Sequence, residues 1–281
     1  GYDARGMSSF FSRLEQQSRL YGSGLPDILR THPLNTARIS EARARAEVLP
    51  LIDRKDPLDF SLMQARVRVQ ALDNFSDGVE YFAGQLAVRD TPANRYGYAY
   101  ALSERGQYAE ALSVLEPALK AHPRQVNLNL LKGKSQLAAG QNKDALVTLA
   151  LAQKLYPRYA PALFAYADAL IASGKPDEAR ALLISSEQAL GTRLETYSLL
   201  AQAARDMKNN AEASFQMASF LYLRGDVDGA MFQLEAGLRL ANLNKQDRSR
   251  LQAKRQEIRD SLPKDWRPPR DDGRRMALRS E

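Results

Sequence analysis

Three glycines separated by a constant step of 34 residues set the strongest constraint on how this chain of 281 residues folds. An alanine follows each glycine after five residues and a leucine after nine. The three columns are Gly106, Gly140 and Gly174; Ala111, Ala145 and Ala179; and Leu115, Leu149 and Leu183. Glycine suits a left-handed helix cap, because it has no Cβ to clash there. Alanine lets two helices approach closely, and leucine fills the seam between them. The columns predict three helix pairs, over 92–125, 126–159 and 160–193.

Two prolines support the same period. Pro123 and Pro157 are also 34 residues apart, and each is expected to end the second helix of its unit. A helix–turn–helix unit of this length resembles the tetratricopeptide repeat. The resemblance implies an all-α solenoid in which each helix packs on its neighbours in the chain.

The repeat is irregular before the first regular unit. Helices are expected at about 59–72 and 76–88, and they form a degenerate unit. Phe75 precedes Tyr108 by 33 residues instead of 34, so the spacing slips by one residue. Such a departure is typical of the terminal unit of a repeat array.

The period halves after the third unit, since Gly225 follows Lys208 by only 17 residues. A helix at about 210–223 is therefore expected to serve as the second helix of one unit and the first helix of the next. Residues 245–261 are predicted to form a polar capping helix, and residues 263–281 a disordered tail.

The charge distribution argues against nucleic acid as a partner. The net charge is +7, but residues 51–244 contain 21 Lys/Arg and 21 Asp/Glu, so the repeat body is neutral. Residues 245–281 contain twelve basic and seven acidic residues, which fits a solvated helix and tail. The chain has no cysteine, which excludes disulfides and thiolate catalysis. No apolar run approaches the roughly 18 residues of a membrane span.

The first 50 residues contain a second set of motifs. The segment Gly1-Tyr2-Asp3-Ala4-Arg5-Gly6-Met7 is followed by Phe10-Phe11, and later by Thr31-His32-Pro33 with Arg38. These motifs resemble the end of an HtpX-like, HExxH zinc metalloprotease domain. In that family a G-[YF]-D-P-x-A-M segment follows the helix with the glutamate zinc ligand. Ala4 replaces the usual proline, and Gly6 the usual alanine.

The resemblance implies zinc in the parent protein and no cofactor in this chain. A zincin binds zinc through two histidines one helical turn apart, with a glutamate between them as general base and a third ligand from elsewhere. This chain has two histidines, His32 and His122, which are 90 residues apart. The zinc ligands proper are therefore expected upstream of Gly1. The parent is expected to be a zinc metalloendopeptidase, and this chain alone is expected to hydrolyse no peptide.

The same resemblance suggests roles for two residues. His32 would lie over the active site as a regulatory zinc ligand that holds the enzyme inactive. Arg38 would face the active site and stabilise the oxyanion of the tetrahedral intermediate. From the residues alone, His32 could instead cap the following helix, and Arg38 could be a solvated charge.

The first helices of tetratricopeptide units line a concave groove, which makes their exposed positions candidates for binding. These candidates are Tyr96, Tyr100, Asn127, Leu130, Lys134, Phe164 and Asp168. Tyrosines among polar residues suit an extended peptide or a protein edge. Alternatively, Tyr96 and Tyr100 pack between units. Recognition of a C-terminal carboxylate would need clustered basic residues, and only Lys134 is well placed.

These observations divide the chain into four parts. They are the end of a metalloprotease domain (1–50), a connector and degenerate repeat (51–91), the tetratricopeptide repeats (92–244), and a capping helix with a flexible basic tail (245–281).

Two functions remain open. In the first, the chain is the substrate- and partner-binding repeat region of a periplasmic zinc metalloprotease and chaperone that promotes assembly or degradation of outer-membrane proteins. Its partners would be the outer-membrane assembly machinery and misfolded outer-membrane clients. In the second, the chain is a non-enzymatic tetratricopeptide-repeat scaffold or adaptor for protein assembly or secretion.

Overall fold

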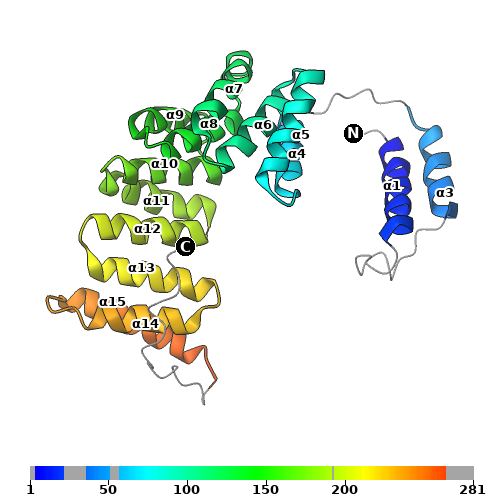
Figure 1. Ribbon diagram of the computed structural model, residues 1–281. Helices are drawn as coiled ribbons and strands as arrows, with labels where there is room; N and C mark the ends of the chain where they lie inside the picture. Colours follow the sequence, from blue (N-terminus) through cyan, green and yellow to red (C-terminus); the bar gives the residue numbers. More distant parts are fainter. Residues whose placement is uncertain (1–3, 22–35, 51–56, 192, 264–281) are drawn as a thin grey trace. The chain divides into compact units, whose positions relative to one another are not determined.

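The computed structural model describes residues 4–21, 36–50, 57–191 and 193–263, and every regular element in these ranges is an α-helix (Figure 1). The chain divides into two units, Gly1–Phe60 and Ser61–Glu281. The tail predicted at 263–281 lies, apart from its first residue, outside the described residues.

The first unit contains two described helices, α1 (Arg5–Tyr21) and α3 (Thr36–Glu47), which pack on each other. Ile39 and Ala46 of α3 are buried, while Met7 and Phe10 of α1 remain exposed. Among the described side chains of this pair, Ile39 and Ala46 are the only buried apolar ones.

The second unit contains a single file of twelve described helices, of which the first, α4, begins three residues before the unit boundary. They are α4 (Leu58–Gln70), α5 (Phe75–Val88), α6 (Pro92–Glu104), α7 (Tyr108–Ala121), α8 (Val126–Ala138), α9 (Asn142–Leu155), α10 (Ala160–Ala172), α11 (Pro176–Leu190), α12 (Leu194–Asp206), α13 (Asn210–Leu223), α14 (Val227–Leu238) and α15 (Lys245–Asp260). From α5 to α15, each helix packs on the next one in the chain. This arrangement confirms the predicted all-α solenoid.

The turn glycines adopt the predicted left-handed conformation. Gly106, Gly140 and Gly174 have φ between +74° and +76°, and Gly225 has φ +81°. After each of them, the next amide donates to a carbonyl five residues back, as in Gln107 N to Leu102 O at 2.9 Å, which closes the helix end. Lys208 takes the same conformation, with φ +58°, without being glycine.

The predicted seam between helix pairs is also present. The alanines and leucines of the two repeat columns are at most 1% exposed. Between α8 and α9, Leu149 fills the space left by Gly133, where an added Cβ would lie 2.5 Å from the leucine side chain. Close approach of the two helices therefore depends on small residues on one side and leucine on the other.

Helix α13 packs on both α12 and α14, in agreement with the expectation from the halved period. It also contacts the capping helix α15, which buries Leu251 and Ile258 against it and α14. The remainder of α15 is largely polar and exposed. A polar outer helix ends the apolar stack, as terminal repeats generally do.

The contact between α5 and α6 gives a test of this packing. An added Cβ at Gly97 would lie 2.5 Å from two ring carbons of Phe82. Alanine is normally about 1 kcal/mol better than glycine within a helix. We nevertheless expect Gly97→Ala to lower the free energy of unfolding by about 1 kcal/mol net, because overpacking costs about 1–3 kcal/mol.

Gly84→Ala is the matched control, because Gly84 of α5 has nothing within 4 Å of an added Cβ. This change is expected to raise the free energy of unfolding by up to about 1 kcal/mol. Urea titration followed by circular dichroism measures both variants. A stabilised Gly97→Ala variant would show that Phe82 does not pack as described.

Candidate protein-binding surface

The first helices of successive units, α4, α6, α8 and α10, lie beside one another and form what we call the first-helix face. One column at the 34-residue step crosses it, with one residue from each helix: Arg66, Tyr100, Lys134 and Asp168. The equal lengths and spacing of these helices put the four residues at equivalent positions. The face therefore presents two cations, a tyrosine and an anion in a row.

The two predicted tyrosines of this face are packed, with Tyr96 3% and Tyr100 7% exposed. Their rings are parallel, with centroids 6.3 Å apart. The guanidinium of Arg66 lies 5.2 Å from the Tyr100 ring centroid, and Gln70 Nε2 donates to Tyr100 Oη at 3.1 Å. Burial raises the pKa of Tyr96 to about 12, although the charge of Arg66 opposes the rise. The two rings are thus fixed by their packing and form the base of the first-helix face, which we call its floor.

Three further predicted positions also face the packed interior. Asn127 and Leu130 of α8 are buried, and Phe164 of α10 is half-buried against the core around α11. The Oδ1 of Asn127 accepts a hydrogen bond from Tyr159 Oη at 3.4 Å. These side chains shape the face but offer little surface to a partner.

Lys134 and Asp168 remain accessible on the face, Lys134 exposed and Asp168 half-buried. Partial burial lowers the pKa of Lys134, and so does the positive charge of Arg66; the charges of Asp168 and Glu104 offset part of this effect. Burial raises the pKa of Asp168, and the charge of Lys134 offsets part of that rise. The charges of Lys134 and Asp168 thus act on each other across the face.

Arg66 and Glu104 belong to this site but were not predicted. The signal was available, since 34 residues before Tyr100 lies Arg66. The prediction instead set the spacing of the degenerate unit from Phe75, which lies in its second helix. In the structure, α4 keeps the 34-residue step from α6, whereas α5 is 33 residues from α7, because the turn between α4 and α5 is one residue longer.

Of the two residues that the metalloprotease resemblance singles out, the structure describes one. His32 lies outside the described residues, and Arg38 is exposed on α3. In the ranges that the structure describes, no group of three or more His, Asp or Glu side chains comes together to hold a metal ion. The roles suggested for His32 and Arg38 therefore stay predictions. In the same ranges, no helix is both long enough and apolar enough to span a membrane.

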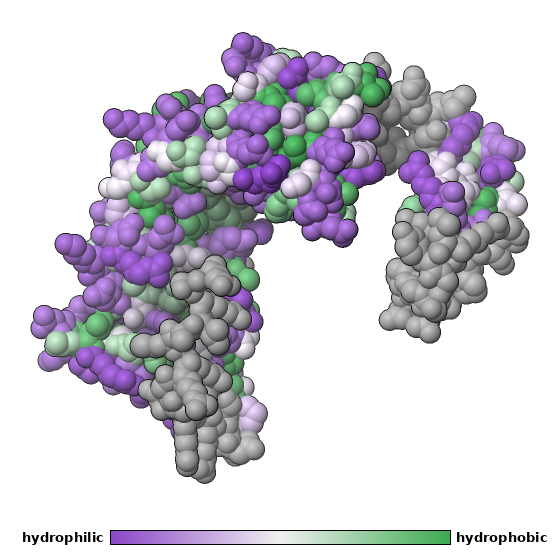
Figure 2. Space-filling model, viewed as in Figure 1, coloured by the Kyte–Doolittle hydropathy of each residue, from purple (hydrophilic) through white to green (hydrophobic). Residues whose placement is uncertain are grey.

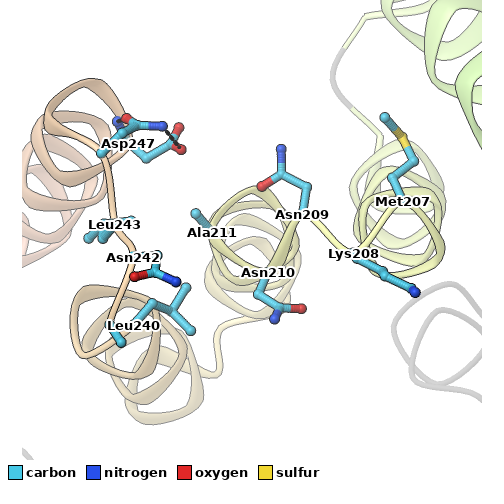
Figure 3. A pocket seen from close by; sticks show the side chains of 11 residues that line it. Met207, Lys208, Asn209, Asn210, Ala211, Leu240, Asn242, Leu243 and Asp247 are labelled. Atoms are coloured by element: carbon cyan, nitrogen blue, oxygen red, sulfur yellow. Dashed lines mark hydrogen bonds between the residues drawn. The ribbon is translucent and has the colours of Figure 1, made fainter.

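The surface also has an open hollow of about 560 Å³ at the helix turns near the C-terminal end of the repeat array (Figure 3). It lies between the α12–α13 turn and the segment that joins α14 to α15. Two of its asparagines are occupied as helix caps: Asn209 Oδ1 accepts from Glu212 N, and Asn244 Oδ1 accepts from Asp247 N. This hollow is thus lined in part by groups that already serve the helix ends.

The visible surface is otherwise mixed. Figure 2 shows hydrophilic residues over most of the described surface in view, with apolar ones scattered between them. Exposed apolar side chains on the second helices include Val88 and Val147. Single residues of this kind are common on protein surfaces and identify no site by themselves.

The family comparison agrees with the repeat architecture. The family model described as tetratricopeptide repeat matches residues 102–157 and 136–191. A solved tetratricopeptide repeat protein from Parabacteroides merdae aligns with a TM-score of 0.47 at 14% identity, over 72% of this chain and 86% of that one.

Curated relatives extend the similarity to almost the whole chain. The β-barrel assembly-enhancing protease of Escherichia coli (strain K12) is 30% identical over 269 residues, which are 92% of this chain and 53% of that protein. The protease of the same name from Yersinia pestis is 27% identical over 272 residues, with 92% and 54% coverage. The chain thus spans about half the length of these relatives. It is a tetratricopeptide-repeat solenoid that resembles β-barrel assembly-enhancing proteases over 92% of its length.

Proposed function

We propose that the chain is the substrate- and partner-binding region of a periplasmic zinc metalloprotease and chaperone that promotes assembly or degradation of outer-membrane proteins. The observation that supports this role is the first-helix face, where Lys134 and Asp168 stay accessible above a rigid floor of tyrosines. The resemblance to proteases named for β-barrel assembly supplies the class of partner. The partners would be the assembly machinery and misfolded clients.

Zinc belongs to the proposed parent protein. Among the described residues, no three metal-binding side chains come together. We assign no step of peptide hydrolysis to the described residues. What the chain contributes under this proposal is capture of the polypeptide.

A scaffold or adaptor without proteolysis is the second candidate, because tetratricopeptide repeats alone are compatible with it. The two differ in the state of the protein that they bind. A client-binding region would capture unfolded outer-membrane protein, whereas an adaptor would bind a folded partner.

Photo-crosslinking tests the proposal directly. A photoreactive amino acid is placed at Lys134 of the first-helix face, and in a separate variant at Val147 of α9, which is 72% exposed on a second helix. Unfolded outer-membrane porin is expected to crosslink at position 134 and not at position 147, because extended polypeptides use the first helices. Crosslinking to a folded soluble protein serves as the control. Equal crosslinking at both positions, or none at 134, would contradict the assigned surface.

A further inference from the structure

The first-helix face has two charged side chains without a hydrogen-bond partner among the described residues. Among the described residues, neither Lys134 nor Asp168 makes an ion pair within 4.0 Å or a side-chain hydrogen bond. They occupy equivalent positions on α8 and α10, which contact each other, and their charges act on each other. Lys134 is exposed and Asp168 half-buried, so a ligand can reach both groups from solvent. A ligand that offers one acceptor and one donor would satisfy both groups.

We propose that Lys134 and Asp168 bind the main chain of an extended polypeptide, with the ammonium donating to a backbone carbonyl and the carboxylate accepting from a backbone N–H. This inference rests on the proposed function and specifies how the client is recognised. In an extended chain, residues i and i+2 present their N–H and C=O groups on the same side, about 7 Å apart. Neighbouring helices are about 8–10 Å apart, so side chains from α8 and α10 match that repeat.

The charge balance of the face disfavours an acidic ligand. The cations Arg66 and Lys134 are accompanied by the anions Glu104 and Asp168, and all four interact electrostatically. Arg66 is further engaged with the ring of Tyr100. The site therefore lacks the surplus of positive charge that a peptide carboxylate would need.

The burial of the tyrosines disfavours recognition of particular side chains. Tyr96 and Tyr100 present almost no free ring surface, so the face offers no aromatic pocket for an anchor residue. Accessible hydrogen-bonding groups above a closed floor are suited to the features that all polypeptides share. Binding of this kind tolerates any sequence that is extended and unfolded.

The test uses a fluorescein-labelled, end-capped neutral peptide of about twelve Ala, Ser, Thr and Gln residues, which spans roughly 40 Å when extended. Its affinity for the 281-residue chain is measured by fluorescence anisotropy. Lys134→Met and Asp168→Ala are each expected to weaken binding about tenfold, as loss of a charge-assisted hydrogen bond does. Lys132→Met is the matched control: its position on α8 lies near Glu116 of α7, and binding is expected to change less than about twofold.

The peptide is varied in parallel. A shuffled sequence is expected to bind equally well, and a version with N-methylated backbone amides about tenfold more weakly, because methylation removes the donor for Asp168. Unchanged binding by the methylated peptide, or a requirement for a free carboxylate, would overturn the inference. Unchanged melting curves show that the variants are folded.

The inference and the proposed function fail in different ways. If porin crosslinks at position 134 while the variants bind the neutral peptide like the unchanged chain, only main-chain recognition is overturned. If neither the peptide nor unfolded porin binds, both are overturned.

Discussion

Ala145→Leu is expected to lower the free energy of unfolding by about 3 kcal/mol. Ala145 of α9 is fully buried, and Leu149, one turn further along the same helix, already fills the space beside Gly133 of α8. Three additional carbons at a fully buried position must push neighbouring helices apart or force side chains out of their preferred rotamers. The upper end of the overpacking range of about 1–3 kcal/mol applies to such a site. Thermal unfolding followed by circular dichroism measures the effect.

Ser113→Leu is the control for this prediction. Ser113 lies on α7, the equivalent second helix of the preceding unit, but its side chain is exposed. The added leucine is expected to change stability by less than about 0.5 kcal/mol, as surface substitutions usually do. If both variants melt at the same temperature, the assignment of the buried seam is wrong.

Arg250→Leu is expected to lower the free energy of unfolding by about 2 kcal/mol at pH 7. Arg250 NH1 of α15 lies 2.7 Å from Glu212 Oε2 of α13, and its guanidinium lies 4.6 Å from the ring centroid of Phe215. The Glu212 side chain is only 9% exposed, so removal of the cation leaves a buried carboxylate with less compensation. Removing one partner of a fully buried ion pair would lower the free energy of unfolding by roughly 3–5 kcal/mol. The effect is smaller here because the Arg250 side chain is 42% exposed.

The stability deficit of this variant is expected to depend on pH. Burial alone would raise the pKa of Glu212, but hydrogen bonds from Gln216 and Arg250, together with nearby positive charge, lower it below its ordinary value of 4.5. The unchanged chain thus gains stability above that value and loses it as the pH falls through the lowered pKa. Arg250→Leu removes one hydrogen bond and one charge, so its deficit is expected to shrink as the pH falls from 7 to about 4.

Arg239→Leu provides the comparison. Arg239, the C-cap residue of α14, pairs with Glu235 at 3.3 Å, but both side chains are exposed, at 72% and 42%. Such a pair contributes at most about 1 kcal/mol, so little change is expected at any pH in this range. Urea titrations of both variants at several pH values decide the matter. An Arg250→Leu deficit that stays constant or grows at low pH would exclude the role given to Glu212.

The repeat fold was predictable because its determinants are local and recur at a fixed step. Gly140 and Ala145 each perform a task that depends on a few neighbouring residues: one adopts positive φ, and the other permits close packing. Each task selects a particular residue type, so the sequence records it at every repeat. Even the halved period had a single physical solution, a helix packed on both of its neighbours.

The accessibility of the site was less predictable. Tyr96 and Tyr100 have the positions expected for the first helices, but contacts with the neighbouring helix α4 bury them. The helix spacing gives the direction of a side chain and not what covers it. Arg66 was missed because an additional residue in the turn after α4 shifts the spacing of α5 alone.

The single-file packing of α5 to α15 has a mechanical consequence. Contacts in the described part of this unit join mainly helices that are adjacent or next-but-one in the chain, so no contact between distant helices fixes the angle at any one seam. A few degrees of tilt at one seam would therefore be transmitted to all helices beyond it, as a lever transmits rotation about its pivot. A bound polypeptide that changes the tilt between α8 and α10 would displace α15 by more than it moves its own binding residues. The array would then behave as an elastic rod whose curvature responds to the load on one side.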